Sequence, residues 1–413
     1  MLRRMAVGVF LFGVTTGVAA PVVTLYSGGF GYIHEVRTVH VAQEGDLVLD
    51  ALPLTLVLDS LVLDGLTVIR LDPVRPTVPS IADLVGTTVT VFAHGERLQG
   101  RLIATTPDLV LATPEGWVFL PSYERMVASA PPSTSPIDQL SVRVRYRDAT
   151  PGESTVGLRY LANGLSWRAA YTAVLDDDTL SLWGLVTLEN QSGVEFMGAQ
   201  VSLVAGDVYR PTGTAPVGYG TRALAAFAEF DVGAAFEYHR YTFPTPVDLT
   251  AGVAVAPLLA GEVMFARAYR FSGGPVEVRV RFTNALGPLP GGEVRVYDMK
   301  GALFVGAATL GHTPVGSDVD LAIGAAFDLT GERVQEARVR IADNFYRDTY
   351  RITLRSAKDT PVEVEVVESL SGTWIVTQHS LPYERLDAQR ILFRVSVPAG
   401  GSAEVRYTVE WRY

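Results

Sequence analysis

The chain has 413 residues, of which 48% are hydrophobic, a formal net charge of −10 at pH 7 and no cysteine. The acidic balance argues against a nucleic-acid partner, whose phosphates require a basic face, and the lack of cysteine excludes disulfides, thiolate nucleophiles and thiolate metal sites. At roughly 100 to 200 residues per domain, this length predicts two or three domains with buried cores.

Residues 1–20 have the layout of a cleavable secretory signal. A basic head (Arg3 and Arg4) precedes an apolar run, and the small residues Ala19 and Ala20 follow it. The run is shorter than the roughly 18 residues that a membrane span needs, so we expect no transmembrane span after cleavage; a retained N-terminal anchor is the alternative. The sequence therefore predicts export to the periplasm or the cell surface.

Apolar and polar residues alternate through most of the chain. In the stretch LSVRVRYR at 140–147 they point to opposite sides of a strand, and the same period of two recurs at 276–282 and 405–413. Half-buried strands of this kind predict an all-β protein built from several β-sandwiches of immunoglobulin-like type. The best candidate for an amphipathic helix is the stretch at 220–230.

Proline-rich breaks and changes of pattern divide the chain into units. A segment rich in Gly, Ala and Pro interrupts the strand pattern after the middle of the chain, and we expect it to be an irregular connection. The organisation that we expect is, in chain order, a signal peptide at 1–20, an N-terminal strand region at 21–80, a small barrel at 81–128, a linker at 129–139, a first sandwich at 140–208 completed by 21–80, the irregular connection at 209–250 and a C-terminal sandwich at 251–413.

The segment between the two proline-rich breaks predicts a small inserted barrel. Residues 84–126 offer about five short strands, separated by turn signals such as Gly95-Glu96. The order of strand, turn, GRL, strand and LVL resembles the Sm-like and SH3-like barrels, which often bind RNA or peptides. Export and acidity argue against RNA, and a purely structural barrel is the simpler interpretation.

Known catalytic signatures are missing from the sequence. It contains no G-x-S-x-G elbow, no G-x-x-x-x-G-K-[ST] loop and no H-E-x-x-H motif, and its six histidines are scattered. We therefore expect no catalytic residue, no cofactor and no metal site. Asp176, Asp177 and Asp178 are expected to form a turn, with calcium binding as the sharper alternative. A carboxylate pair for glycoside hydrolysis, which would form only in space, stays open.

Several stretches together resemble one known family. They are VTLYSGGFGYIHEVRTVHV at 23–41, the block from Tyr160 to Val208 with its G.SW corner, and the block from Arg281 to Leu329 with its PLP.G.VRVY pattern. Their order is similar to that of the mucoidy-inhibitor-like (mucoidy inhibitor A) family, a bacterial envelope domain of unknown function. The resemblance implies a β-rich envelope protein and offers no catalytic residues. The long coiled coil that many members carry is not visible here.

The same blocks supply residues that we expect to specify the fold. Trp167 and Trp183 are large enough to anchor the space between two sheets, with sugar stacking as the alternative, and the Asn, Pro and Gly residues are typical of turns. The expected structural signature comprises Trp167, Tyr171, Trp183, Asn190, Gly193, Asn284, Pro290 and Gly291. The possible ligand platform comprises Trp117, Trp374 and Trp411.

Taken together, the sequence predicts an exported, non-enzymatic envelope protein that binds a protein or polysaccharide partner through its β-sandwich domains. Two alternatives stay open. The chain could be a carbohydrate-active enzyme with a carboxylate pair at a sandwich edge, or a carbohydrate-binding module that acts on envelope glycans through exposed tryptophans. No nucleic-acid partner is expected, and the sequence leaves the oligomeric state open.

Overall fold

The computed structural model describes residues 19–74, 81–128, 139–206, 221–223, 231–235, 238–300 and 302–412. Within these ranges the regular structure consists of β-strands and two short 3-10 turns, η1 (Leu58–Ser60) and η2 (Ile81–Leu84). The predicted all-β class, with several separate sheets, is confirmed. None of the described segments forms a helix long and apolar enough to cross a bilayer. Most of the expected signal peptide, residues 1–18, lies outside the described residues.

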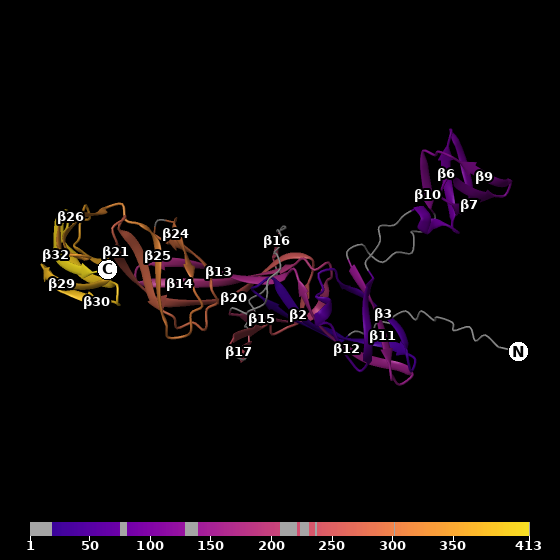
Figure 1. The fold of residues 1–413 in the computed structure, drawn as a ribbon, viewed down its shortest axis with the longest axis horizontal. Helices are drawn as coiled ribbons and strands as arrows, with labels where there is room; N and C mark the ends of the chain where they lie inside the picture. Colours follow the sequence, from indigo (N-terminus) through magenta and orange to yellow (C-terminus); the bar gives the residue numbers. More distant parts are fainter. Residues whose placement is uncertain are drawn as a thin grey trace.

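The N-terminal strands share two sheets with the strands of residues 139–206. Figure 1 shows the sheets following one another along the long axis of the molecule, with these two on the side away from the C-terminus. Sheet I contains, in spatial order, β17 (Asp231–Ala235), β18 (Tyr238–Thr242), β15 (Phe196–Ala205), β1 (Ala19–Tyr26), β2 (Phe30–Val41), β12 (Gly152–Asn163) and β4 (Val62–Asp64), with β19 (Val247–Leu249) also paired to β15. Sheet II contains β3 (Gly45–Pro53), β11 (Gln139–Arg147) and β5 (Thr67–Val74).

Sheet III is formed by the inserted segment alone and lies apart from the other sheets in Figure 1. It contains β10 (Arg125–Ala128), β6 (Thr88–Ala93), β7 (Glu96–Ala104), β8 (Leu109–Thr113) and β9 (Gly116–Leu120). In the described residues of this segment β9 and β10 are the two edges of the sheet, so the closed Sm-like or SH3-like barrel stays a prediction. Sheet III has a small hydrophobic core of its own.

Sheet IV joins strands from distant parts of the chain. It contains β16 (Thr221–Ala223), β20 (Gly252–Met264), β14 (Thr179–Asn190), β13 (Leu165–Asp176), β23 (Gly292–Asp298) and β24 (Leu303–Leu310). β20 pairs antiparallel with β14, and β23 pairs in parallel with β13. Strand pairing therefore crosses the domain boundary expected at residue 250. The sequence did not predict this, because a parallel partner so far along the chain leaves no trace in the local pattern.

Sheets V and VI form the C-terminal end of the molecule. Sheet V contains β25 (Asp318–Ala325), β22 (Glu277–Thr283), β21 (Ala266–Phe271), β28 (Val362–Ser369), β31 (Arg390–Val397) and β30 (Tyr383–Arg385). Sheet VI contains β26 (Leu329–Ala342), β27 (Phe345–Ser356), β32 (Ser402–Arg412) and β29 (Thr373–His379). Figure 1 shows their strands grouped around the C-terminus.

Two large hydrophobic cores hold these sheets together. The first runs without a break through sheets I, II and IV into sheet V, and includes Val23, Trp167 and Val280. The second lies between sheets V and VI and includes Phe393 and Tyr407. Burying a side chain of this size contributes about 1.5 to 3 kcal/mol. Sheet V therefore belongs to both cores, and the expected C-terminal sandwich is not separate from the first.

Two expectations about residues 209–250 are corrected by the structure. The prediction of a helix at 220–230 is wrong for the part of it that the structure describes, since Thr221–Ala223 is a strand that pairs in parallel with β20. Residues 224–230 lie outside the described residues. The segment expected to be an irregular connection instead contributes β16, β17, β18 and β19. The sequence did not reveal these strands, because they are too short to show a clear period of two.

Candidate functional site

The Asn163-Gly164 turn leads from β12 into β13 and sets the face on which the next aromatic residues lie. Gly164 has a φ of 72°, and a Cβ there would lie 3.0 Å from a backbone carbonyl oxygen, so the turn favours glycine. From this turn the period of two places Trp167 and Tyr171 on the core face, where they are 3% and 1% exposed. The indole Nε1 of Trp167 donates to the carbonyl of Val204 in sheet I at 3.1 Å. The corner therefore connects two sheets through its aromatic side chains, while the exposed Arg168 between them forms an ion pair with Glu189.

Trp183 does not anchor the core, and that expectation is wrong. It is 38% exposed on the outer face of β14 and pairs across the ladder with Thr172. Leu180 and Leu182 alternate with it and take the core positions. Parity decides this placement, because neighbouring residues of a strand point to opposite faces. The signal was present in the stretch TLSLWGLV, where the alternating leucines mark the buried face.

The other signature residues hold turns. Asn190 is 1% exposed and its Nδ2 donates to two backbone carbonyls at 2.8 and 3.0 Å, while Gly193 in the same turn has a φ of 86°. Asn284 is 0% exposed and its Nδ2 donates to three carbonyls at 2.7, 3.1 and 3.2 Å. The carbonyl of Pro290 accepts a tyrosine hydroxyl, and the amide of Gly291 donates to a histidine ring at 3.1 Å. All of these contacts are structural.

Two of the three platform tryptophans are half-buried and already covered. The indole Nε1 of Trp374 donates to the carbonyl of Ala388 at 2.9 Å, and the guanidinium of Arg385 lies 4.5 Å from the ring centre. Trp411 stacks on Tyr346 with 5.1 Å between ring centroids. An arginine over a tryptophan face forms a favourable cation–π contact that leaves less ring surface for a sugar.

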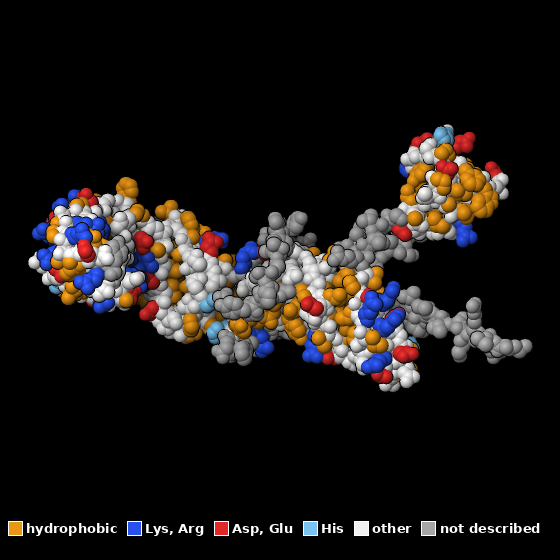
Figure 2. Space-filling view, viewed as in Figure 1, with side chains coloured by type: hydrophobic (Ala, Val, Ile, Leu, Met, Phe, Trp, Pro, Cys, Tyr) orange, Lys and Arg blue, Asp and Glu red, His pale blue; other side chains and the backbone are white. Residues whose placement is uncertain are grey.

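Trp117 is the platform tryptophan that projects into solvent. It is 64% exposed in β9 at the edge of sheet III, and Phe119, two residues further on the same face, is 63% exposed. In β8, Ala112 pairs with Trp117 and Val110 pairs with Phe119, but Val110 is buried, so the exposed apolar surface consists of the two rings. Figure 2 shows hydrophobic side chains gathered on this unit. We call Trp117 and Phe119 the aromatic face; Phe119 was missed from the sequence, although its spacing of two from Trp117 was the available signal.

The acidic triplet forms a turn between β13 and β14. Asp177 takes a φ of 49° there, and its carboxylate pairs with the ammonium of Lys300. Asp tolerates this conformation, as the turn interpretation requires. Among the residues that the structure describes, no group of three or more His, Cys, Asp or Glu side chains is placed to hold a metal ion.

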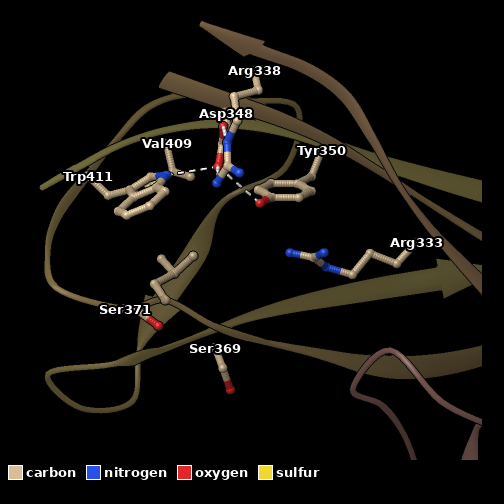
Figure 3. A pocket seen from close by; sticks show the side chains of 9 residues that line it. Arg333, Arg338, Asp348, Tyr350, Ser369, Ser371, Val409 and Trp411 are labelled. Atoms are coloured by element: carbon tan, nitrogen blue, oxygen red, sulfur yellow. Dashed lines mark hydrogen bonds and ion pairs between the residues drawn. The ribbon is translucent and has the colours of Figure 1, made fainter. Parts of the chain in front are cut away.

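A pocket of about 230 Å³ opens between sheets V and VI (Figure 3). Its lining comes from β26, β27 and β32 on one side and from β28 and the residues after it on the other: Arg333, Arg338, Asp348, Tyr350, Ser369, Leu370, Ser371, Val409 and Trp411. Figure 3 shows Arg338, Asp348, Tyr350 and Trp411 close together on one wall, with the two serines opposite. This is where the structure brings charged, aromatic and hydroxyl groups together.

Asp348 is the centre of the polar groups in this pocket. Its side chain is 1% exposed, and Arg338 donates to it through Nε and a terminal nitrogen at 3.0 and 3.1 Å. The Trp411 indole and the Tyr350 hydroxyl donate to the same carboxylate at 2.8 and 3.2 Å. Burial alone would raise the pKa of Asp348, but the hydrogen bonds from Arg338 and Trp411 outweigh it and hold this pKa below its usual value.

Glu368 is a second buried carboxylate beside the pocket. Its side chain is 2% exposed, accepts a 2.8 Å hydrogen bond from Nε of Arg333 and accepts another from the Tyr407 hydroxyl. Burial would lower the pKa of Arg333, but Glu368 and Tyr407 outweigh it, so the pKa is raised and the guanidinium stays charged. The same guanidinium lies 3.9 Å from the ring centre of Tyr350. This network ties β26 and β32 of sheet VI to β28 of sheet V.

The pocket is better suited to holding two sheets together than to acid catalysis. Glycoside hydrolysis needs a carboxyl group whose raised pKa keeps it protonated near neutral pH. The described Asp and Glu residues with a shifted pKa all have it lowered, and they are Asp46, Asp320, Asp348, Glu365 and Asp387. The carboxylate that the pocket buries most deeply is therefore an ionised acceptor.

The sequence matches no family model and no curated protein. A functional assignment therefore depends on the residues of the chain itself. Of the features described above, the aromatic face presents unpaired surface, and the pocket between sheets V and VI presents groups that already bind one another.

Proposed function

We propose that the protein is an exported, non-enzymatic component of the bacterial envelope that binds a polysaccharide through the aromatic face of sheet III. The signal-like residues 1–20 support export, and the resemblance to the mucoidy-inhibitor-like family supports an envelope role. We include membership of that family in the proposal. The observation that carries the binding role is the exposure of Trp117 and Phe119 on one face of an edge strand.

Two aromatic rings at this spacing suit a sugar chain. At about 3.3 Å per residue, side chains two positions apart stand roughly 7 Å apart along the strand. The C–H faces of pyranose rings pack on aromatic rings through dispersion and removal of apolar surface from water. This repeat of two rings along one strand matches the repeating rings of a polysaccharide, and the experiment below distinguishes it from a protein partner.

Binding without chemistry agrees with the electrostatics of the described residues. The shifted carboxyl groups are held ionised by arginines or backbone amides, which favours a structural role over proton donation. A polysaccharide would therefore be retained and left intact. Figure 1 shows sheet III apart from the other sheets, where a long polymer can reach it.

An equilibrium binding experiment tests the proposal. The mature chain is passed over immobilised polysaccharides isolated from bacterial envelopes, and the eluted glycans are assayed for new reducing ends. We expect retention on at least one polysaccharide with no increase in reducing ends. New reducing ends would show a carbohydrate-active enzyme instead, and capture of a defined envelope protein without any glycan retention would replace the polysaccharide with a protein partner.

A further inference from the structure

Two hollows open side by side at the junction of sheets IV and V. The larger has a volume of about 750 Å³ and the smaller of about 290 Å³, and Leu175, Arg267 and Asp298 line both. They lie where β20 passes through Phe265 into β21, beside the turns that end β13 and β23. Because they share these residues, the hollows adjoin each other, and we call the two together the junction cleft.

The smaller hollow has a mainly apolar floor. Val278, Val305 and Ile323 line it from three different strands, together with the ring of Tyr269. Phe327 also lines it and is 97% exposed. These side chains offer two aromatic rings and several aliphatic groups to the apolar face of a ligand.

Charged side chains of both signs surround this floor. The lining carries three cations and three anions, Arg267, Lys300, Lys358, Asp177, Asp178 and Asp298. The guanidinium of Arg267 makes no ion pair or hydrogen bond with a side chain in the described ranges. The ammonium of Lys358 lies 3.9 Å from the carboxylate of Asp328 and 5.4 Å from the Tyr269 ring centre. Hydrogen-bonding capacity therefore remains for a ligand in the cleft.

Lys300 and Lys358 are the only lysines of the chain, and both line the junction cleft. Apart from six histidines, every other basic side chain is an arginine. A lysine presents three rotatable donors on a flexible stem, whereas an arginine presents a fixed planar fork, so the two are not interchangeable as hydrogen-bond donors. The position of the two lysines is an observation independent of the shape of the cleft, and it points to the same part of the molecule as a ligand site.

We propose that the junction cleft binds a neutral saccharide chain. This inference rests on the proposed function and adds a second contact for the same class of ligand. A polyanion would meet three carboxylates and a polycation would meet three cations, whereas a sugar hydroxyl both donates and accepts hydrogen bonds and suits neighbouring groups of opposite sign. The C–H faces of the sugar rings would cover the apolar floor beside Tyr269 and Phe327.

Amine footprinting tests this proposal directly, because the only lysines report on the cleft. The mature chain is acylated with an acetyl N-hydroxysuccinimide ester, alone and with neutral hexasaccharides of glucose, mannose, galactose or N-acetylglucosamine, and each lysine is followed by peptide mass spectrometry. Hexagalacturonate is the anionic arm. With a neutral hexasaccharide at ten times its dissociation constant, we expect acylation of Lys300 and Lys358 to slow about tenfold while the α-amine is unaffected.

A variant of the partnerless arginine gives a second measurement. Arg267→Ala should weaken binding of the protecting hexasaccharide about tenfold or more, because hydrogen bonds to a charged donor are lost. Arg143→Ala, which removes an exposed arginine on sheet II, is the matched control and should bind like the wild type. A folded Arg267→Ala variant with unchanged affinity would contradict the proposal. So would unchanged acylation with every neutral hexasaccharide, or protection by hexagalacturonate alone.

The aromatic face and the junction cleft can fail separately. A variant that carries both Trp117→Ala and Phe119→Ala leaves the cleft intact, so lysine protection should persist in it. If that variant still binds the polysaccharide and its lysines are protected, the result supports binding in the junction cleft and contradicts binding at the aromatic face. If the wild type binds the polysaccharide but no neutral saccharide protects the lysines, the result contradicts binding in the junction cleft and leaves the proposed function supported.

Discussion

The hydroxyl of Tyr171 donates a 2.7 Å hydrogen bond to the carbonyl of Pro290, which lies 119 positions further along the chain. Tyr171 belongs to β13, and Pro290 lies two residues before β23, the parallel partner of β13. Gly292 allows this approach, since a Cβ there would lie 2.3 Å from the carbonyl oxygen of Ala169. Burial raises the pKa of Tyr171, so its hydroxyl stays a donor. The block from Tyr160 to Val208 and the block from Arg281 to Leu329 therefore meet in one sheet.

Replacing Trp167 should destabilise the protein strongly. The side chain is 3% exposed, and Trp167→Ala removes both its packing and its hydrogen bond to Val204, so we expect a loss of roughly 3 to 5 kcal/mol in the free energy of unfolding. Trp183→Ala is the matched control, because that ring is 38% exposed and should cost less than about 1 kcal/mol. Urea unfolding of both variants measures the difference, and equal losses would contradict the assignment of faces in sheet IV.

Asn284 should be required as an amide. Its Nδ2 donates to three carbonyls and its Oδ1 accepts the amide of Leu286, so Asn284→Ala leaves buried groups unsatisfied and should cost roughly 2 to 3 kcal/mol. Asn284→Asp keeps the acceptor but loses both donors at pH 7, so it should destabilise at least as much and recover partly as the acid is protonated. Thermal unfolding at pH 7 and pH 4 measures both variants, with the exposed Gln378→Ala as control. An Asp variant as stable as the wild type at pH 7 would refute the hydrogen-bond assignment.

Asp348 should make stability depend on acid pH. A carboxyl group whose pKa is lower in the folded than in the unfolded chain stabilises the fold above its unfolded pKa, about 4, and this contribution is lost as the pH falls through the folded value. Asp348→Asn should therefore lower stability at pH 7 by roughly 2 to 4 kcal/mol and have little effect near pH 2. The melting temperature between pH 2 and 7 measures this slope. Asp343→Asn, at a carboxylate that is 92% exposed, should leave it unchanged, and a wild-type slope in Asp348→Asn would show that another group controls it.

The local sequence pattern predicted the class of the fold, because alternation of apolar and polar residues along a strand involves only neighbouring positions. The alternation around Trp167 and Tyr171 placed both in the core, and the Asn163-Gly164 turn fixed where β13 begins. The same parity, applied to Leu180 and Leu182, would have placed Trp183 outside. These features were within reach of the sequence because they involve residues one to four positions apart.

Pairings between distant segments were out of reach. The parallel pairing of Ala169 with Gly292 and the continuation of the first core into Val280 depend on non-local contacts, so the boundary expected at residue 250 did not separate two sandwiches. The pocket network likewise joins Arg333 to Glu368, on strands that are consecutive in neither sequence nor sheet. Exposure of the aromatic face could be suggested by the sequence, but the burial of Val110 opposite Phe119 required the register of β8 and β9.

The aromatic face should be needed for binding and not for folding. Trp117 and Phe119 are 64% and 63% exposed, so replacing both with Ala should change the free energy of unfolding by no more than about 0.5 kcal/mol per site. Loss of two stacking rings should weaken polysaccharide binding at least about tenfold. Trp183→Ala removes an exposed indole from another sheet and is the control for loss of a tryptophan alone.

The most direct measurement is the affinity of the mature chain for its envelope polysaccharide, compared between the wild type, the variant with Trp117→Ala and Phe119→Ala, and Trp183→Ala, with unfolding curves for all three. We predict that the double variant alone loses at least about tenfold in affinity while all three proteins unfold at closely similar urea concentrations. A stable double variant that binds the polysaccharide as tightly as the wild type would contradict the account.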